Sequence, residues 1–159
     1  MMSRVAAWAV QGVLVILFLG VLLAQVLTPM VAAEAGRQFP EVAHLVVPYS
    51  VAAIVALVFV QVAIVAVARL AGLSAGGRVF APRSLRWVDV VIGCAVAVAV
   101  LSAGVWVHLV LIEATGGPGA MLAILFATVG AAGVALLMVV MRGLLAAAIA
   151  DRAELAQVI

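Results

Sequence analysis

The sequence predicts an all-α polytopic membrane protein, a bundle of four transmembrane helices with both termini in the cytoplasm. Hydrophobic residues make up 70% of the 159 positions and charged residues 9%. Soluble domains carry about 45–50% apolar and about 25% charged residues. Four apolar runs are each long enough to cross a bilayer, which takes about 20 residues. We expect helices in all four, because backbone groups in lipid must be hydrogen-bonded within their own segment.

The first span is expected at residues 5–27, and Thr28-Pro29 is expected to end it. Arg4, the apolar run and the small residues that follow also resemble a signal peptide. The run is longer than a usual signal core, however, so we expect a retained transmembrane helix. A short loop then leads to His44, with one or two helical turns at residues 30–39.

Three further spans complete a single integral membrane domain over residues 1–159. We expect them at residues 45–70, 87–112 and 121–145. Pro48 lies near the start of the second span, where a missing amide hydrogen does least harm. A cytoplasmic loop at residues 71–86 separates the second span from the third, and a helical extension at residues 146–159 follows the fourth.

The arginines set the orientation. If four helices alternate in direction, all but one of the arginines lie on the same side: Arg4, Arg69, Arg78, Arg83, Arg86, Arg142 and Arg152. The opposite side carries Arg37 together with Glu34, Glu41 and Glu113. Because basic residues collect on the cytoplasmic side of membrane proteins, both termini and the loop at residues 71–86 are expected in the cytoplasm.

Small residues and neutral polar residues predict where the helices pack. Small residues recur along one side of three spans: Gly12, Gly20 and Ala24 on the first, Ala95, Ala99 and Ala103 on the third, and Ala123, Ala127, Ala131 and Ala135 on the fourth. Such stripes allow close helix approach, although a high alanine content also produces them by chance. The neutral polar residues are expected to hydrogen-bond between helices: Gln11, Gln25, Gln61, Ser102 and Thr128.

Ionisable residues within the spans are scarce, which argues against a proton- or ion-coupled transporter. Asp89 follows Arg86 by three residues, so we expect these two to form a local ion pair. Arg142 lies at the end of the fourth span, where its side chain can reach the interface.

Two histidines, His44 and His108, are expected near the outer boundary, with Glu41 and Glu113 close by. Residues of these types bind zinc, and two histidines can also hold haem axially. The sequence has no ligand-spacing signature, so His44 and His108 are only secondary metal candidates, and no cofactor is predicted.

The basic loop is the candidate binding surface for a partner. Phe80 is expected to plug the inner interface, Pro82 to preset the first turn of a helix, and Arg83 and Arg86 to face lipid headgroups. The candidate partner-binding residues come from this loop and from the C-terminal extension: Arg78, Phe80, Arg83, Arg86, Asp151 and Glu154. The alternative is a lipid-facing anchor loop with no other role.

The same loop carries a family resemblance. The run Gly77-Arg78-Val79-Phe80-Ala81-Pro82, followed by Leu85-Arg86 and Gly93, resembles the G-x-x-F-S/A-P … L-R … I-G segment of a bacterial family of four-helix membrane proteins. That family is domain-of-unknown-function family 2975, and residues 152–159 resemble its usual ending, with fewer acidic residues. The arginine-only, alanine- and valine-rich composition resembles an actinobacterial member.

The resemblance implies a multi-pass protein of the bacterial plasma membrane that partners a helix-turn-helix, DNA-binding regulator. It transfers no catalytic residues. We therefore expect a non-enzymatic interaction or regulatory protein at the inner membrane face. The alternatives are an accessory subunit of a larger membrane complex or homo-oligomer, and a binder or carrier of a hydrophobic small molecule. Direct nucleic acid binding is not expected, because the net charge is only +2.

Overall fold

The computed structural model describes residues 4–75, 82–113 and 117–157, and every regular element in these ranges is helical. The long helices are α1 (Arg4–Gln38), α2 (Val46–Ala75), α3 (Pro82–Val107) and α4 (Pro118–Gln157). A short 3₁₀ helix, η1 (Pro40–Leu45), precedes α2, and a π-helical turn, η2 (His108–Ile112), continues α3. Within the described ranges four helices are long and apolar enough to cross a membrane, which confirms the predicted all-α, multi-pass fold.

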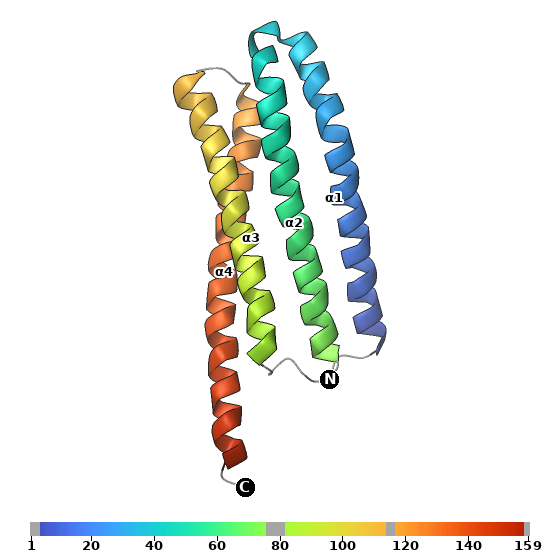
Figure 1. The fold of residues 1–159 in the computed structure, drawn as a ribbon, viewed down its shortest axis with the longest axis vertical. Helices are drawn as coiled ribbons and strands as arrows, with labels where there is room; N and C mark the ends of the chain where they lie inside the picture. Colours follow the sequence, from blue (N-terminus) through green and yellow to red (C-terminus); the bar gives the residue numbers. More distant parts are fainter. Residues whose placement is uncertain (1–3, 76–81, 114–116, 158–159) are drawn as a thin grey trace.

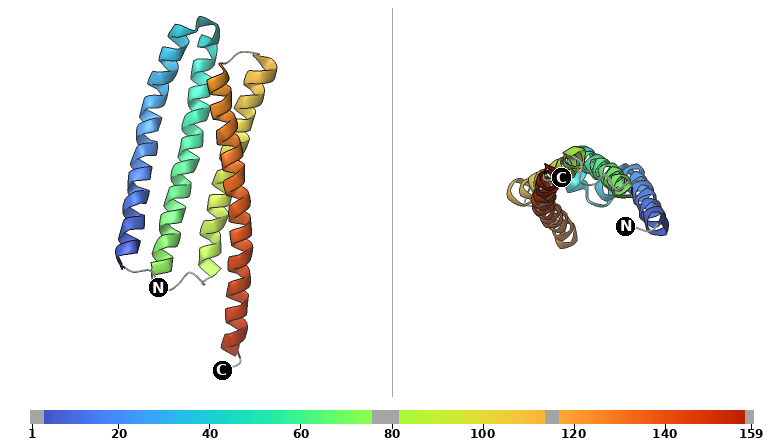
Figure 2. Two further views of the ribbon diagram at one scale, coloured as in Figure 1. Left: turned by 180° about the vertical axis from the view of Figure 1, so that it is seen from behind. Right: turned by 90° about the horizontal axis from the view of Figure 1, so that it is seen from below.

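The four helices form an open, curved row. In the described residues α1 packs on α2, α2 on α3 and α3 on α4 (Figure 1), whereas α1 and α4 make no contact with each other. Seen from below, the helices follow an arc with α1 and α4 at its two ends (Figure 2). The row therefore has a concave face between its two edge helices.

The two ends of the row carry different side chains, and each end is named here after the residue type that marks it. The arginine end is where α2 ends and α3 begins, and it carries Arg69, Arg86 and Arg142. The histidine end is where α1 gives way to η1 and α3 gives way to η2, and it carries His44 and His108.

Burial is concentrated on α3. Ser84, Val88, Val91 and Ala95 are buried and recur at the spacing of one helix face. None of the described side chains of α1 is buried, because this helix contacts only α2 and η1. The many exposed apolar side chains suit a protein whose outer surface faces lipid rather than water.

The first helix does not end at Thr28-Pro29, so that expectation is wrong. Pro29 cannot donate an amide hydrogen to the carbonyl of Gln25, but α1 continues through it to Gln38. Membrane helices tolerate proline within a span, and the neighbouring Thr28 hydroxyl donates to the carbonyl of Ala24, at 2.7 Å, rather than to the carbonyl of Gln25.

Instead, α1 ends where a second proline follows. Pro40 disfavours the helical conformation of the residue before it, and Phe39 has φ −127° and ψ 82°. The chain then turns so tightly that a Cβ on Gly36 would lie 2.6 Å from Cγ2 of Val46. Glycine at position 36 therefore allows the end of α1 to approach the start of α2.

The predicted small-residue interfaces are confirmed in part. On α3, Ala95 is buried and Ala99 and Ala103 are half-buried. On α4 the stripe runs from exposed Ala123 and Ala127 through half-buried Ala131 to buried Ala135. A four-residue step on a helix of 3.6 residues per turn drifts by about 40°, so a straight stripe leaves the interface.

On α1 the prediction is wrong. Gly12, Gly20 and Ala24 are all exposed, and a Cβ on either glycine would have no neighbour within 4 Å. The physical reason is that α1 is an edge helix, and its small residues do not face α2.

Neutral polar side chains join the helices within the spans, as predicted. Gln25 of α1 donates from Nε2 to Oε1 of Gln61 on α2 at 3.2 Å. Thr128 of α4 lies 3.0 Å from the hydroxyl of Ser102 on α3. Gln11, by contrast, is exposed on α1.

Candidate functional site

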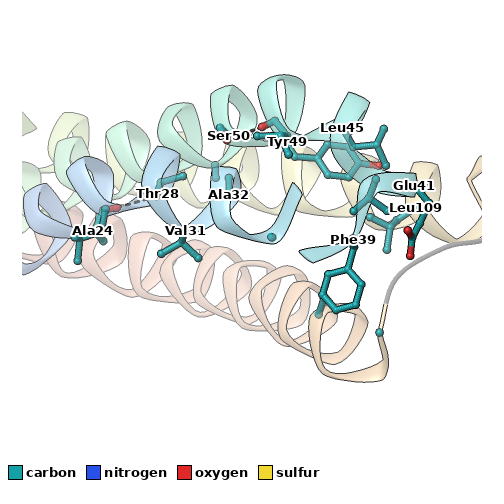
Figure 3. Close-up of a pocket in the computed structure, with 17 residues that line it drawn as sticks. Ala24, Thr28, Val31, Ala32, Phe39, Glu41, Leu45, Tyr49, Ser50 and Leu109 are labelled. Carbon is teal, nitrogen blue, oxygen red and sulfur yellow. Dashed lines mark hydrogen bonds between the residues drawn. The ribbon is translucent and has the colours of Figure 1, made fainter. Parts of the chain in front are cut away.

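A cavity of about 1000 Å³ opens on the concave face at the histidine end (Figure 3). Its wall is built mainly from α1, η1 and the start of α2, with contributions from η2 and the start of α4. The lining residues are Ala24, Leu27, Thr28, Val31, Ala32, Ala35, Phe39, Glu41, Val42, Leu45, Val46, Tyr49, Ser50, Ala53, Leu109, Gly117 and Ala120. Both edge helices, α1 and α4, line the cavity, but they do not contact each other. The cavity therefore lies between the two edges of the row.

The inner wall of the cavity consists mainly of apolar side chains. Its few hydroxyl groups already form hydrogen bonds within the protein. Thr28 donates to the carbonyl of Ala24, and Ser50 donates to the carbonyl of Val46 at 2.5 Å. The Tyr49 hydroxyl lies 2.8 Å from Nδ1 of His108. Glu41 is the charged exception: its side chain is exposed, and no described residue pairs with its carboxylate.

Two polar pairs tie α2 and η1 to the end of the third span. Nε2 of His44 lies 3.2 Å from Oε2 of Glu113. The rings of Tyr49 and His108 meet edge to face, with centroids 6.0 Å apart. His108 begins the π-helical turn η2, where the amide of Glu113 donates to the carbonyl of His108 at 3.1 Å. Single π-helical turns are frequent at functional sites.

The arrangement gives no support to the secondary metal candidates. His44 and His108 each have a different protein partner, Glu113 and Tyr49. Among the residues that the structure describes, no group of three or more His, Cys, Asp or Glu side chains could hold a metal ion.

At the arginine end, an ion pair joins α4 to α3 and a cation–π contact joins α2 to α3. Arg142 of α4 pairs with Asp89 of α3 through Nε and Nη2. The expected pair between Asp89 and Arg86 is therefore wrong, because a guanidinium that meets both carboxylate oxygens across two helices is a stronger partner than a neighbour on one helix. The guanidinium of Arg69 on α2 lies 5.8 Å from the ring centre of Trp87 on α3, within cation–π range.

The predicted partner-binding residues are only partly described. Arg86 and Asp151 are exposed on α3 and α4, at the arginine end. Arg78 and Phe80 lie outside the described residues, and the side chains of Arg83 and Glu154 lie outside the described part of their helices. Any contact between the loop and the tail thus remains a prediction.

Sequence reasoning did not find the cavity, the Asp89–Arg142 pair or the Tyr49–His108 contact. At the arginine end, Asp89 and Arg142 are the ionisable residues deepest in their spans. Their similar depth in the sequence indicates that they could pair. Tyr49 is the single tyrosine of the chain and lies about one turn beyond His44, on the side of the histidine end. The cavity left no sequence signal, since its lining residues are mostly alanine, valine and leucine.

A family model described as a protein of unknown function (DUF2975) matches residues 30–159, most of the chain. The match includes the motif from Gly77 to Gly93 and the C-terminal segment, the two stretches that carry the resemblance. No curated protein and no solved structure matches the chain.

Proposed function

The chain belongs to the DUF2975 family of proteins of unknown function, and we propose that it is a non-enzymatic protein of the bacterial plasma membrane that holds a partner at the inner face. Two features support this proposal: the distribution of charge between the two ends of the row, and the length of α4.

The charges support an orientation with both termini in the cytoplasm. The arginine end carries Arg69, Arg86 and Arg142, with further arginines in the adjoining loop and tail. The histidine end carries the glutamates Glu34, Glu41 and Glu113 and the single Arg37. Because arginine is favoured on the cytoplasmic side, the arginine end is the inner end in this proposal.

The observation that carries the proposal is that α4 projects beyond the other helices at the arginine end (Figure 1). The pair of Asp89 and Arg142 marks one level on the antiparallel α3 and α4. From that level α3 continues for seven residues to Pro82, whereas α4 continues for fifteen to Gln157. At 1.5 Å per residue, the last eight residues or so of α4 extend about 12 Å past the start of α3.

A projecting helix beside a basic loop offers a surface for recognition. Asp151 on α4 and Arg86 on α3 are exposed at this end and have opposite charges. Exposed ion pairs contribute only about 0–1 kcal/mol, so such charges readily exchange one partner for another. The family resemblance makes a helix-turn-helix, DNA-binding regulator the first partner to test.

A second candidate is an accessory subunit of a larger membrane complex or a homo-oligomer. The open row favours it, because α1 has no buried side chain among its described residues and contacts only α2 and η1. A further helix from another subunit would complete the packing of α1.

Purification in a mild detergent, followed by identification of stoichiometric partners, tests both candidates. We expect a soluble partner that is lost when the chain is truncated after Leu145 or when Arg86 is replaced by Glu. Arg37, exposed at the opposite end of the row, provides the matched control in Arg37→Glu, which should keep the partner. A membrane partner retained by all three variants would instead favour the accessory subunit.

A further inference from the structure

We propose that the cavity at the histidine end binds one hydrocarbon chain of an amine-bearing lipid from the outer leaflet, with the amine at Glu41. The proposal rests on the orientation given above, in which the histidine end is the outer end. It does not depend on the identity of a partner at the inner face.

The cavity has the position and extent of a lipid chain. Along α1 its lining runs from Ala24 to Ala35, eleven residues or about 16 Å of helix, and Phe39 continues it just beyond the end of α1. The hydrocarbon core of a bilayer is about 30 Å thick, so the cavity extends inward from the outer boundary to the middle of the membrane. A volume of about 1000 Å³ is at the upper end of the range of ligand cavities, about 300–1,000 Å³.

The wall chemistry selects a hydrocarbon chain rather than a polar ligand. The hydroxyls of Thr28 and Ser50 donate to backbone carbonyls, and the Tyr49 hydroxyl is hydrogen-bonded to Nδ1 of His108. A hydrogen-bond acceptor placed against this wall, away from Glu41, would find the hydroxyl protons of Thr28 and Ser50 already donated and would bear the cost of its desolvation. Because apolar cavities do not hold water, a chain from the surrounding bilayer is the natural occupant.

The route into the cavity is lateral. One side of the wall belongs to α1, through Thr28 and Val31, and the other to the start of α4, through Ala120, with Gly117 just before this helix. These two helices do not contact each other. A lipid can therefore slide in from the side with its head at the membrane surface.

Glu41 sets the preference for the head group. Glu34 is occupied by Arg37 and Gln38, and Glu113 is occupied by His44. Glu41 borders the cavity, lies at the same end as Phe39 (Figure 3) and has no partner among the described residues. A protonated amine placed there gains a charge-assisted hydrogen bond, whereas a carboxylate or sulfate is repelled.

Photolabelling with matched amphiphiles tests the proposal. The protein is reconstituted in phosphatidylcholine vesicles with a sixteen-carbon chain that carries a diazirine near its end and an amine, alcohol or carboxylate head. We expect saturable labelling of the cavity wall that unlabelled hexadecylamine displaces. The amine should label about tenfold better than the carboxylate, as one charge-assisted contact allows.

Two matched pairs of variants separate the chain from the head. Ala32 lines the cavity and Ala33, next to it, is exposed and does not. Ala32→Trp should abolish saturable labelling, and Ala33→Trp should preserve it. Glu41→Gln should keep the labelling but remove the preference for the amine, and Glu34→Gln should keep both.

Three results would overturn the proposal. If Ala32→Trp left the labelling unchanged, the label would come from contact with bulk lipid and not from binding in the cavity. An amine preference that survives Glu41→Gln would refute the assignment of the head group. Labels confined to lipid-facing residues outside the cavity would refute the site. None of these results would affect the proposed capture of a partner at the inner face, which is tested by co-purification.

Discussion

Arg142 and Asp89 form the contact that joins α4 to α3 at the arginine end, with Nε 2.5 Å from Oδ1 and Nη2 3.5 Å from Oδ2. Both side chains are about half exposed, 46% for Arg142 and 49% for Asp89. The contact matters for function because it anchors α4 to α3 about seven residues before α4 passes the start of α3 and begins to project. It therefore fixes the level from which the tail extends.

Breaking this pair should loosen α4 without preventing insertion. We expect Asp89→Asn and Arg142→Gln each to lower the midpoint of thermal unfolding in detergent, because each leaves one charge without its partner. Exchanging the two residues, with Asp89→Arg and Arg142→Asp together, should restore most of the loss. Arg86→Gln is the matched control and should leave the midpoint unchanged. If Arg86→Gln were as harmful as Arg142→Gln, the local pair expected from the sequence would be the true one.

The sequence was sufficient to predict what depends on one helix at a time. The four spans, the helical start at Pro82 and the bridging roles of Gln25, Gln61, Ser102 and Thr128 all follow from length, composition and local chemistry. They were predicted because lipid requires helices and penalises unpaired polar groups.

What depends on the lateral arrangement of helices could not be predicted. Asp89 has an arginine three residues away in sequence, and only the packing of α3 on α4 brings Arg142 closer. Pro29 predicts the end of a helix and a loop after it, but α1 continues through Pro29 to Gln38. The cavity arises from the gap between α1 and α4, two helices that are far apart in the chain, and no periodic pattern records that gap.

Gly36 should be far less tolerant of substitution than Gly20. A Cβ at position 36 would lie 2.6 Å from Cγ2 of Val46, whereas at position 20 it would meet nothing within 4 Å. Overpacking typically costs about 1–3 kcal/mol, so Gly36→Ala should lower the free energy of unfolding by about that amount. Gly20→Ala should be neutral or stabilising by up to about 1 kcal/mol. Urea- or detergent-induced unfolding monitored by circular dichroism measures both.

A second-site change provides the internal check. Val46→Ala removes the methyl groups that a new Cβ at position 36 would strike. Combined with Gly36→Ala it should recover most of the lost stability. No recovery would mean that Gly36 matters for another reason, such as the turn into η1.

The alanines of α4 should differ along the helix. Ala135 is 7% exposed, whereas Ala127 is exposed. Ala135→Leu should force α4 away from α3 and cost about 1–3 kcal/mol of stability, while Ala127→Leu should be tolerated. Thermal unfolding of the two variants side by side measures the difference, and equal stability would show that the α3–α4 interface differs from the one described.

The orientation is tested by two exposed positions at opposite ends of the row. Gln38 ends α1 at the histidine end, and Asp151 lies on α4 at the arginine end. The single native thiol, Cys94, is buried and is replaced by alanine. In whole cells a membrane-impermeant maleimide should then label Gln38→Cys and spare Asp151→Cys.

Permeabilised cells should label both positions, which controls for accessibility. The expected pattern follows from the arginines, because their excess at one end favours that end in the cytoplasm. Labelling of Asp151→Cys alone in intact cells would reverse the orientation. The projecting end of α4 would then face outward and could not hold a cytoplasmic regulator, and the cavity with Glu41 would open to the inner leaflet.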